Sequence, residues 1–223
     1  MTAEEYFNDW FKFINKQKLK SVLDSINTQY NNKQCEPAYN NIFKVFNITP
    51  YDKLKVVFLG QDPYPQKDIA TGIAFANKKD CLELSPSLNV LKEAVIDFEI
   101  PHNYITFDPT LEEWSKQGIL LLNASLTVER NKPNSHCLIW KSFTETFLDK
   151  LSLYNPGLIY VLWGKYAQSF KDCIHNGIIM EVHHPSYYAR THTKLPHSFF
   201  VELDKVIKEQ YDEEILWYNE LKN

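Results

Sequence analysis

Four short apolar runs stand out along the chain and set its main pattern. They are rich in Val, Ile and Leu, and several begin or end at a glycine. None shows the strict alternation of polar and apolar positions that marks a strand with one solvent-exposed face. The runs are 55–60, 118–123, 157–164 and 177–182. This pattern predicts four β-strands that are buried on both faces.

Segments between these runs have the apolar spacing of amphipathic helices. Leu88, Leu91 and Val95 recur at helical intervals, after Ser85 at a cap position and Pro86 at the first helical position. A second series is Ile139, Phe143, Phe147 and Leu151. The regions before residue 50 and after residue 197 also favour helices. We therefore predict an α/β fold, a three-layer α/β/α sandwich around a central, mainly parallel four-stranded sheet.

The chain has 223 residues, which suits one large domain, and no Pro-, Gly- or Ser-rich linker divides it. Its longest apolar run, 158–163, is far below the roughly 18 residues that a membrane span requires. The first residues lack the basic and apolar segments of a secretory signal. We expect a single domain over residues 1–223, a cytoplasmic location, a monomer and no membrane partner.

The formal net charge of -4 is unevenly distributed. Residues 202–223 contain seven Asp and Glu against three Lys, which accounts for the whole net charge. Residues 182–201 contain no acid, two basic residues (Arg190 and Lys194) and four histidines. This local positive stretch is typical of a solvated loop, and it also suits contact with an anion such as nucleic acid.

The cysteines show no sign of a metal site. Cys35, Cys81, Cys137 and Cys173 lie far apart, without the short spacing of zinc or iron-sulfur ligands. We therefore predict buried, reduced thiols and no metal.

Polar residues follow each predicted strand at its carboxyl end. They are Asp62, Asn123, Lys165 and His184. Each has an ordinary explanation alone: Asp62 before Pro63, for example, is a common turn combination. Carboxyl ends of parallel strands meet at one edge of a sheet, where ligands bind. A carboxylate, an imidazole and an amide gathered there suit a reaction that builds a cation on one atom and an anion on another.

Several longer motifs around these residues resemble family 1 uracil-DNA glycosylases. They are 60–64 (GQDPY), 72–75 (GIAF), 85–88 (SPSL), 114–124 (WSKQGILLLNA), 134–136 (NSH), 162–164 (LWG) and 184–186 (HPS). The resemblance extends from about residue 40 to 217. It implies an enzyme that extrudes a uracil nucleotide from DNA and hydrolyses the bond between base and deoxyribose, leaving an abasic site for base excision repair.

The resemblance also implies the residues that recognise the base. The amide of Asn123 would accept from uracil N3–H and donate to O4, whereas cytosine presents the reverse pattern. Phe75 would stack on the ring, and Tyr64 would stand beside C5, where thymine carries a methyl group. Core packing is the ordinary role of an aromatic residue, so only the motif positions of Phe75 and Tyr64 indicate a pocket.

By the same resemblance, Asp62 and His184 are the catalytic pair. Asp62 would stabilise the cationic sugar and orient or deprotonate the attacking water, while His184 would donate a hydrogen bond to uracil O2. Backbone N–H groups near Gln61 and Asp62 would add to that support. No metal and no organic cofactor is implied.

The DNA contacts implied by the resemblance surround the same edge. Ser87 lies in the first turn of a predicted helix, where free N–H groups favour a phosphate. Phosphates beside the flipped nucleotide would be held near Lys165 and Ser186, and Tyr187 and Tyr188 would enter the vacated stack. The expected DNA-binding residues are Ser87, Gly164, Lys165, Ser186, Tyr187, Tyr188 and Arg190. The expected partners are uracil-containing DNA, single- or double-stranded, and a protein inhibitor that mimics uracil.

The chain departs from the family's usual motifs at four positions. Pro65 stands where a histidine is common, Tyr188 where the wedge is commonly leucine, and Lys165 and Ala189 where serines are common. An added lysine should make DNA binding more dependent on salt. None of these positions is in the predicted base pocket, so we expect an active enzyme with an altered contact to DNA.

Three other functions fit parts of the pattern. The first is a non-catalytic DNA-binding or replication-accessory protein with the same fold. The second is a glycosylase for a 5-modified uracil, which the bulk of Tyr64 disfavours. The third is a metal-dependent hydrolase built on His183, His184 and Asp62, although adjacent histidines on a strand point apart.

Overall fold

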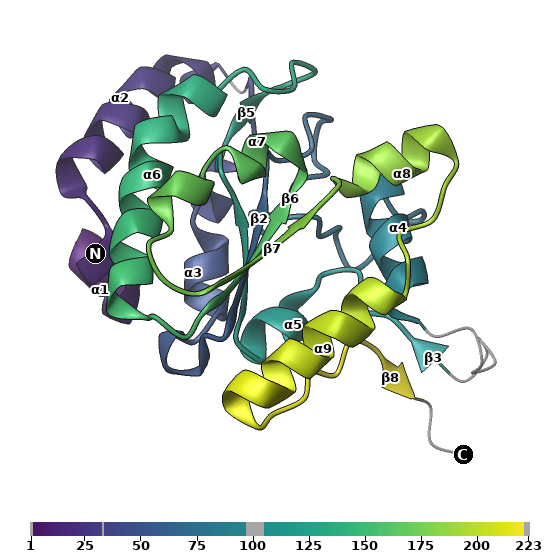
Figure 1. Cartoon of the computed structure of the whole chain (residues 1–223). Coiled ribbons are helices and arrows are strands. Elements are labelled where there is room, and N and C mark those ends of the chain that lie inside the picture. Colours follow the sequence, from purple (N-terminus) through teal and green to yellow (C-terminus); the bar gives the residue numbers. More distant parts are fainter. Residues whose placement is uncertain (1, 33, 97–104, 221–223) are drawn as a thin grey trace.

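The centre of the computed structural model, which describes residues 2–32, 34–96 and 105–220, is a parallel four-stranded sheet (Figure 1). Its strands lie in the order β4 (Ile119–Asn123), β2 (Val56–Gly60), β6 (Ile159–Trp163) and β7 (Ile178–Val182). All three neighbouring pairs are parallel. The four predicted strands and their parallel pairing are therefore confirmed.

The burial of the strands agrees with the prediction for three of the four. Every residue of β2, β4 and β6 is buried, because each lies against helices on both faces. For β7 the prediction of burial is wrong, since its residues are half-buried or exposed. It lies at one edge of the sheet beside β6, whereas β4, at the other edge, is buried because α3 (Lys44–Ile48) and α5 (Glu112–Lys116) pack against it.

Helices cover both faces of the sheet and confirm the three-layer arrangement. Helices α2 (Lys16–Asn31) and α6 (Cys137–Tyr154) lie on one side, and α4 (Pro86–Val95) and α9 (Ser198–Tyr211) lie on the other (Figure 1). The shorter helices are α1 (Ala3–Phe7), α3 (Lys44–Ile48), α5 (Glu112–Lys116), α7 (Gly164–Gln168) and α8 (Pro185–Thr191). The helices predicted from Pro86, over residues 139–151 and after residue 197 are confirmed.

Short elements complete the described part of the chain. The 3₁₀ turns are η1 (Asn8–Phe13), η2 (Tyr39–Asn41), η3 (Tyr51–Lys53) and η5 (Lys171–Cys173). Two antiparallel pairs, β1 (Cys35–Glu36) with β5 (Val128–Glu129) and β3 (Ile105–Thr106) with β8 (Asn219–Glu220), lie outside the main sheet. Such two-residue strands carry no apolar run, so the sequence pattern did not predict them.

The start of α4 is at the predicted residue but for a different reason. Ser85 occupies the cap position and Pro86 the first turn, yet the Ser85 side chain makes no capping hydrogen bond. Its hydroxyl donates instead to the hydroxyl of Tyr64 at 2.6 Å. A residue type favoured at helix ends therefore contacts an aromatic side chain of another segment here.

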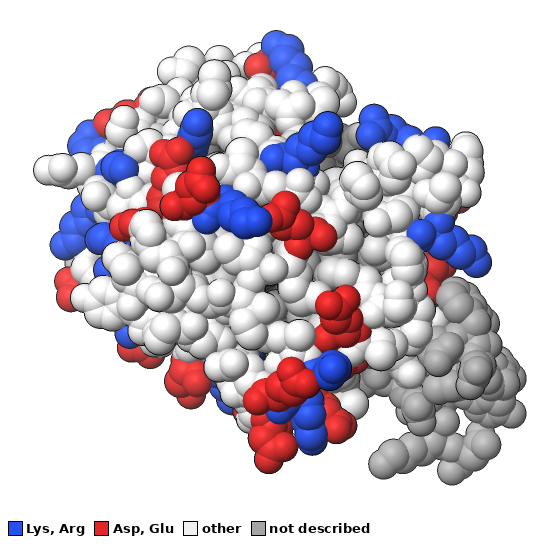
Figure 2. All heavy atoms as spheres, in the orientation of Figure 1, with Lys and Arg blue, Asp and Glu red and all other residues white. Residues whose placement is uncertain are grey.

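Charge and cysteine placement follow the sequence pattern only in part. Figure 2 shows Asp and Glu side chains gathered over α9, and Lys and Arg side chains over the region of α8. All four cysteines are free thiols, and Cys81 and Cys173 are only half-buried, so the prediction of burial holds for Cys35 and Cys137 alone. None of the helices in the described ranges combines the length and apolarity needed to cross a membrane.

Candidate active site

A pocket of about 340 Å³ opens at the carboxyl ends of the central strands. All six predicted catalytic and base-binding residues line it, together with three of the predicted DNA-binding residues: Gln61, Asp62, Tyr64, Phe75, Asn123, His184, Ser87, Ser186 and Arg190. They come from the segments that follow β2, β4 and β7 and from the first turn of α4. The parallel sheet therefore brings residues that are distant in sequence to one edge.

Asp62 lies two residues after β2 and is held by two hydrogen bonds. Its Oδ2 accepts the backbone N–H of Asn134 at 2.7 Å, and its Oδ1 accepts from Gln61 Nε2 at 3.3 Å. Burial raises the pKa of the Asp62 carboxyl above its ordinary value, while these hydrogen bonds oppose the rise. The result is a desolvated carboxylate with a fixed orientation, as expected for a group that faces a developing positive charge.

His184 follows β7 and has a defined tautomer. Its Nδ1 accepts the backbone N–H of Ser186 at 3.2 Å and lies 2.8 Å from the Ser186 hydroxyl. Burial, with a smaller effect of the Arg190 charge, lowers the pKa of His184 to about 4. The ring is therefore neutral near pH 7, and because Nδ1 is an acceptor, the proton resides on Nε2. This leaves an N–H donor for a ligand.

A glycine permits the close packing behind His184. Gly164 begins α7 in the left-handed region, with φ of +85°, and a side chain there would bring a Cβ within 2.8 Å of the His184 Cβ. Any other residue would therefore push the histidine away from its position. Gly164 does not itself line the pocket, so its predicted contact with DNA is a separate matter from this packing role.

Asn123 ends β4 directly opposite Gly60 of β2. Its side chain is buried at 8% exposure, and a Cβ on Gly60 would lie 2.6 Å from Asn123 Oδ1 and 3.1 Å from Phe75 Cζ. The absence of a side chain at residue 60 thus leaves the space in which the amide and the aromatic ring sit. This glycine was placed at a strand end by the sequence pattern, but its part in the pocket was not predicted.

Phe75 adopts a backbone conformation that is rare for a bulky residue, with φ of +67°. Its ring centroid lies 5.6 Å from that of His184 and 5.8 Å from that of Trp163. Strained backbone of this kind persists only where the surroundings impose it, and such residues cluster at functional sites. The prediction that Phe75 forms one wall of a base pocket fits this placement.

Tyr64 forms the neighbouring wall and has both roles of its hydroxyl satisfied. The O–H donates to the Phe75 carbonyl at 2.9 Å and accepts from the Ser85 hydroxyl at 2.6 Å. Burial raises the pKa of Tyr64 to about 12. The side chain is therefore a neutral phenol whose ring position is fixed from two sides.

The predicted DNA-binding residues are not all gathered in this pocket. Lys165 is exposed on α7, and Tyr187 and Tyr188 lie on α8, all outside the lining. Tyr187 stacks on His183, with ring centroids 4.5 Å apart and planes at 22°. The two tyrosines thus lie on a helix rather than in the expected loop, because Pro185 at the helix start and His184 as its cap initiate α8.

Asn134 contacts two of the predicted site residues, and the sequence pattern did not predict these contacts. Its backbone N–H binds Asp62, and its side-chain oxygen accepts from Gln61. The backbone at Asn134 is left-handed, with φ of +70°, which turns its N–H toward the carboxylate. The segment NSH was noted as a motif, but nothing local shows that it reaches a residue 72 positions earlier.

The histidines in the described ranges form no metal centre. Among the described residues, no group of three or more His, Cys, Asp or Glu is arranged to hold a metal ion. His183 stacks on Tyr187, whereas His184 Nδ1 is occupied by Ser186, so the adjacent rings face different partners. The geometry therefore gives no support to the metal-dependent alternative.

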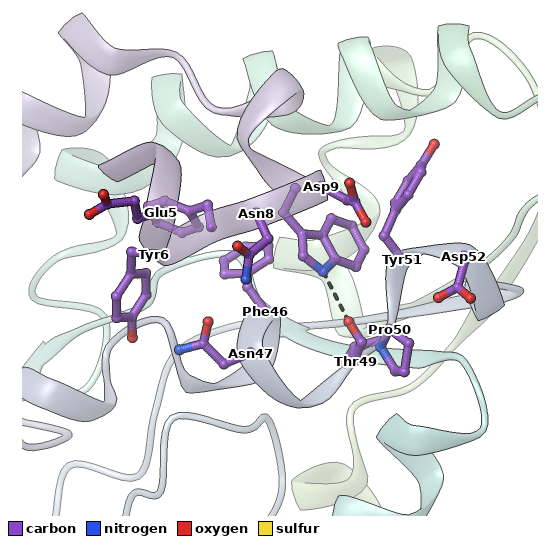
Figure 3. A pocket seen from close by; sticks show the side chains of 12 residues that line it. Glu5, Tyr6, Asn8, Asp9, Phe46, Asn47, Thr49, Pro50, Tyr51 and Asp52 are labelled. Carbon is purple, nitrogen blue, oxygen red and sulfur yellow. Dashed lines mark hydrogen bonds between the residues drawn. The ribbon is translucent and has the colours of Figure 1, made fainter. Parts of the chain in front are cut away.

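A second hollow, of about 540 Å³, lies at the other end of β2, beside the turn that precedes the strand. Glu5, Asp9 and Asp52 line it, and Trp10 Nε1 donates to the Thr49 carbonyl at 3.0 Å (Figure 3). None of the predicted site residues, all of which are in the described ranges, lines this hollow. Its acidic lining is unsuited to a polyanion such as DNA.

Comparison with known proteins identifies a consistent set of relatives. Residues 46–208 match the family model described as the uracil DNA glycosylase superfamily. A uracil-DNA glycosylase of Francisella tularensis subsp. novicida is 37% identical over 221 residues, which cover 93% of this chain and 97% of that protein. One from Campylobacter lari is 40% identical over 190 residues, which cover 81% of each chain.

Two solved structures share the fold. A substituted mimivirus UNG in complex with UGI superposes with a TM-score of 0.80 at 24% identity, over 97% of this chain and 88% of that one. The UNG of Nitratifractor salsuginis superposes with a TM-score of 0.61 at 18% identity, over 94% of this chain and 95% of that one. At these identities the structures establish the architecture, while the sequence relatives and the family model establish the kinship.

Proposed function

The chain belongs to the uracil DNA glycosylase superfamily, and from that premise we propose how its own residues excise uracil. It is a uracil-DNA glycosylase, a hydrolase that acts on the N-glycosyl bond in DNA repair. The observation that supports the residue assignments most strongly is the single pocket lined by Asp62, Asn123 and His184. We also propose that residues 1–223 form one domain.

Base recognition is assigned to Asn123. Its buried amide stands at the end of β4, where Oδ1 accepts from uracil N3–H and Nδ2 donates to O4. Cytosine offers an acceptor at N3 and a donor at C4, so it would leave both amide atoms facing like partners. An unpaired buried polar group is costly, which makes the discrimination strong.

Phe75 and Tyr64 set the shape of the pocket. The Phe75 ring provides a face for stacking on uracil, while Tyr64 occupies the space beside C5. A methyl group at C5 would meet a phenol ring that two hydrogen bonds hold in place. Thymine is therefore excluded by contact rather than by hydrogen bonding.

Bond cleavage places positive charge on the deoxyribose and negative charge on uracil. The Asp62 carboxylate stabilises the cationic sugar and orients or deprotonates the water that attacks C1′. Burial strengthens this interaction, since little solvent screens the carboxylate from the sugar. Asn134 and Gln61 fix the carboxylate, so they act as positioning residues.

The leaving base is stabilised by neutral His184. Its Nε2–H donates to uracil O2, where negative charge develops as the bond breaks. A neutral donor suits this task because its pKa of about 4 keeps it from titrating in the working range. The backbone N–H groups of Gln61 and Asp62 add to this stabilisation. Uracil departs as its anion, so a second carboxylic acid is not needed.

DNA is gripped by groups around the pocket mouth. The N–H groups in the first turn of α4, at Ser87, bind one phosphate, and Ser186 contacts another, with Arg190 beside them. At the start of α7, Gly164 and Lys165 contact the DNA backbone. Tyr187 and Tyr188 of α8 enter the gap left by the extruded nucleotide. Because mimivirus UNG binds UGI in its solved complexes, this face is also where we place binding of a protein inhibitor.

The test is a base panel in the presence of EDTA. Matched oligonucleotides, single- and double-stranded, carry one uracil, thymine, cytosine or 5-hydroxymethyluracil, and alkali cleaves any abasic site. Cutting at uracil alone is the expected result. Bound but uncut uracil DNA would contradict the proposed chemistry, and cutting at 5-hydroxymethyluracil would contradict the role given to Tyr64. Loss of cutting in EDTA would contradict the metal-independent mechanism.

A further inference from the structure

Tyr64 separates two cavities. One is the active-site pocket, and the other, which we name the outer cavity, has a volume of about 470 Å³ and is lined by residues that include Tyr64, Ile69, Asn77, Leu84, Ser85 and Pro86. Among the residues that the structure describes, Tyr64 alone lines both cavities. Any movement of that ring away from the base would therefore enlarge the active-site pocket on the side of uracil C5.

A chain of hydrogen bonds holds this wall. Ser85 Oγ–H donates to the Tyr64 hydroxyl at 2.6 Å, and the Tyr64 hydroxyl donates to the Phe75 carbonyl at 2.9 Å. Asn77 fixes Ser85 in turn, because Asn77 Oδ1 accepts the Ser85 backbone N–H at 2.7 Å. Asn77 is 3% exposed, and its own N–H donates to the Pro109 carbonyl at 2.8 Å. The wall is thus linked to a buried anchor.

The Ser85 hydroxyl has no other evident task in the described structure. It stands at the cap position of α4 yet does not cap the helix, so the helix end does not depend on it. The Ser87 side chain also forms a hydrogen bond with the Tyr64 hydroxyl, but Ser87 lies within the pocket that binds substrate. Ser85 lines only the outer cavity, on the far side of the ring. Its hydroxyl therefore reaches the base pocket through Tyr64.

We propose that Ser85 is a positioning residue for base specificity: its hydroxyl holds the Tyr64 ring in place between the active-site pocket and the outer cavity. We call this hydrogen bond the latch. With the latch closed, the pocket admits a base with hydrogen at C5. Without it, the ring yields toward the outer cavity and the pocket accepts methyl or hydroxymethyl groups at C5. This inference rests on the proposed function, since it concerns the same pocket.

The test compares Ser85→Ala with Ser85→Thr, which keeps the hydroxyl. The readout is the ratio of kcat/KM for 5-hydroxymethyluracil to kcat/KM for uracil in otherwise identical single-stranded oligonucleotides, with thymine as a second 5-substituted base. Loss of one hydrogen bond should raise this ratio by about three- to tenfold in Ser85→Ala. Ser85→Thr should remain near the wild-type ratio. A thermal melt of each variant shows whether the fold is retained.

A second variant keeps the test valid even if the Ser85 variants fail to fold. Tyr64→Phe removes the hydroxyl but keeps the ring, so it should raise the ratio similarly, and adding Ser85→Ala to it should have no further effect. An unchanged ratio in Ser85→Ala, or equal increments of Ser85→Ala in both backgrounds, would overturn the latch. Wild-type protein that fails to cut uracil would instead refute the proposed function.

Discussion

Gly60 offers a sharp test of the pocket, because alanine there should damage function without damaging the fold. The added Cβ would lie 2.6 Å from Asn123 Oδ1 and 3.1 Å from Phe75 Cζ. Residue 60 is not in the left-handed region, so its backbone tolerates a side chain. The oxygen is the end of a side chain that can rotate, which keeps the cost to folding small.

The cost to catalysis follows from the displacement. An ordinary contact of about 3.4 Å requires Asn123 Oδ1 to move by about 0.8 Å. Misplacing a substrate-positioning group by about 1 Å can lower the rate by about 10²-fold, which equals about 2.7 kcal/mol. Alanine also restricts the unfolded chain more than glycine does, which raises the free energy of unfolding by about 0.4–1 kcal/mol and offsets much of the strain in the folded state. We therefore expect Tm to change by only about 2–4 °C.

The assay is single-turnover excision from a uracil oligonucleotide, with a thermal melt of the same samples. Gly157→Ala is the matched control. It also introduces a methyl group at a glycine that is not left-handed, but the nearest atom is Gln210 Nε2 at 3.0 Å, at the opposite end of the sheet. The control should retain wild-type excision and a similar Tm.

Two results would refute this reasoning. Wild-type excision by Gly60→Ala would mean that the Asn123 amide does not need its observed position to bind the base. A large fall in Tm that accompanies the loss of excision would mean that Gly60 supports the fold rather than the pocket.

Three further substitutions test separate parts of the site. Asp62→Asn should lower turnover by about 10³-fold while DNA binding persists, since the amide oxygen can still accept the Asn134 N–H. If kinetic and binding assays showed that turnover and DNA binding are lost together, the catalytic role of Asp62 would be contradicted. His184 has a folded pKa of about 4 against 6.5 unfolded, so it contributes stability that is present above pH 6.5 and is lost as the pH falls toward 4. In urea titrations between pH 7 and 4, the free energy of unfolding should thus fall by about 2–3 kcal/mol more in wild type than in His184→Gln. Equal falls in the two proteins would refute the lowered pKa of His184. Lys165→Ala should reduce the slope of log Kd against log salt by about 0.7–0.9, and an unchanged slope would remove Lys165 from the DNA contact.

The sheet was predictable because its strands carry their own signal. Buried parallel strands need continuous apolar runs, and these runs stood at β2, β4, β6 and β7. The exposure of β7 was not predictable from its composition, because both β4 and β7 are edge strands and only the packing of helices against β4 buries it. Likewise, α8 begins at Pro185 within a polar, histidine-rich stretch that lacks a long apolar period.

The site was predictable at its motifs and less so between them. Asp62, Asn123 and His184 follow strands, so parallel pairing alone was enough to expect them at one edge. Asn134 could not be linked to Asp62, since its contribution is a backbone N–H, which no side-chain type reveals. Ser85 was expected to cap a helix, and only the structure shows its hydroxyl on Tyr64.

Asn123→Asp tests the proposal that Asn123 selects the base by its hydrogen-bond pattern. When protonated, the carboxylic acid donates to cytosine N3 and accepts from the exocyclic amine, which is the complement that the amide lacks. Excision should be measured on matched cytosine and uracil oligonucleotides across pH 5 to 8. We predict that the variant cuts at cytosine, increasingly so toward low pH, with reduced cutting at uracil. Undiminished cutting at uracil with cytosine untouched would contradict the proposal.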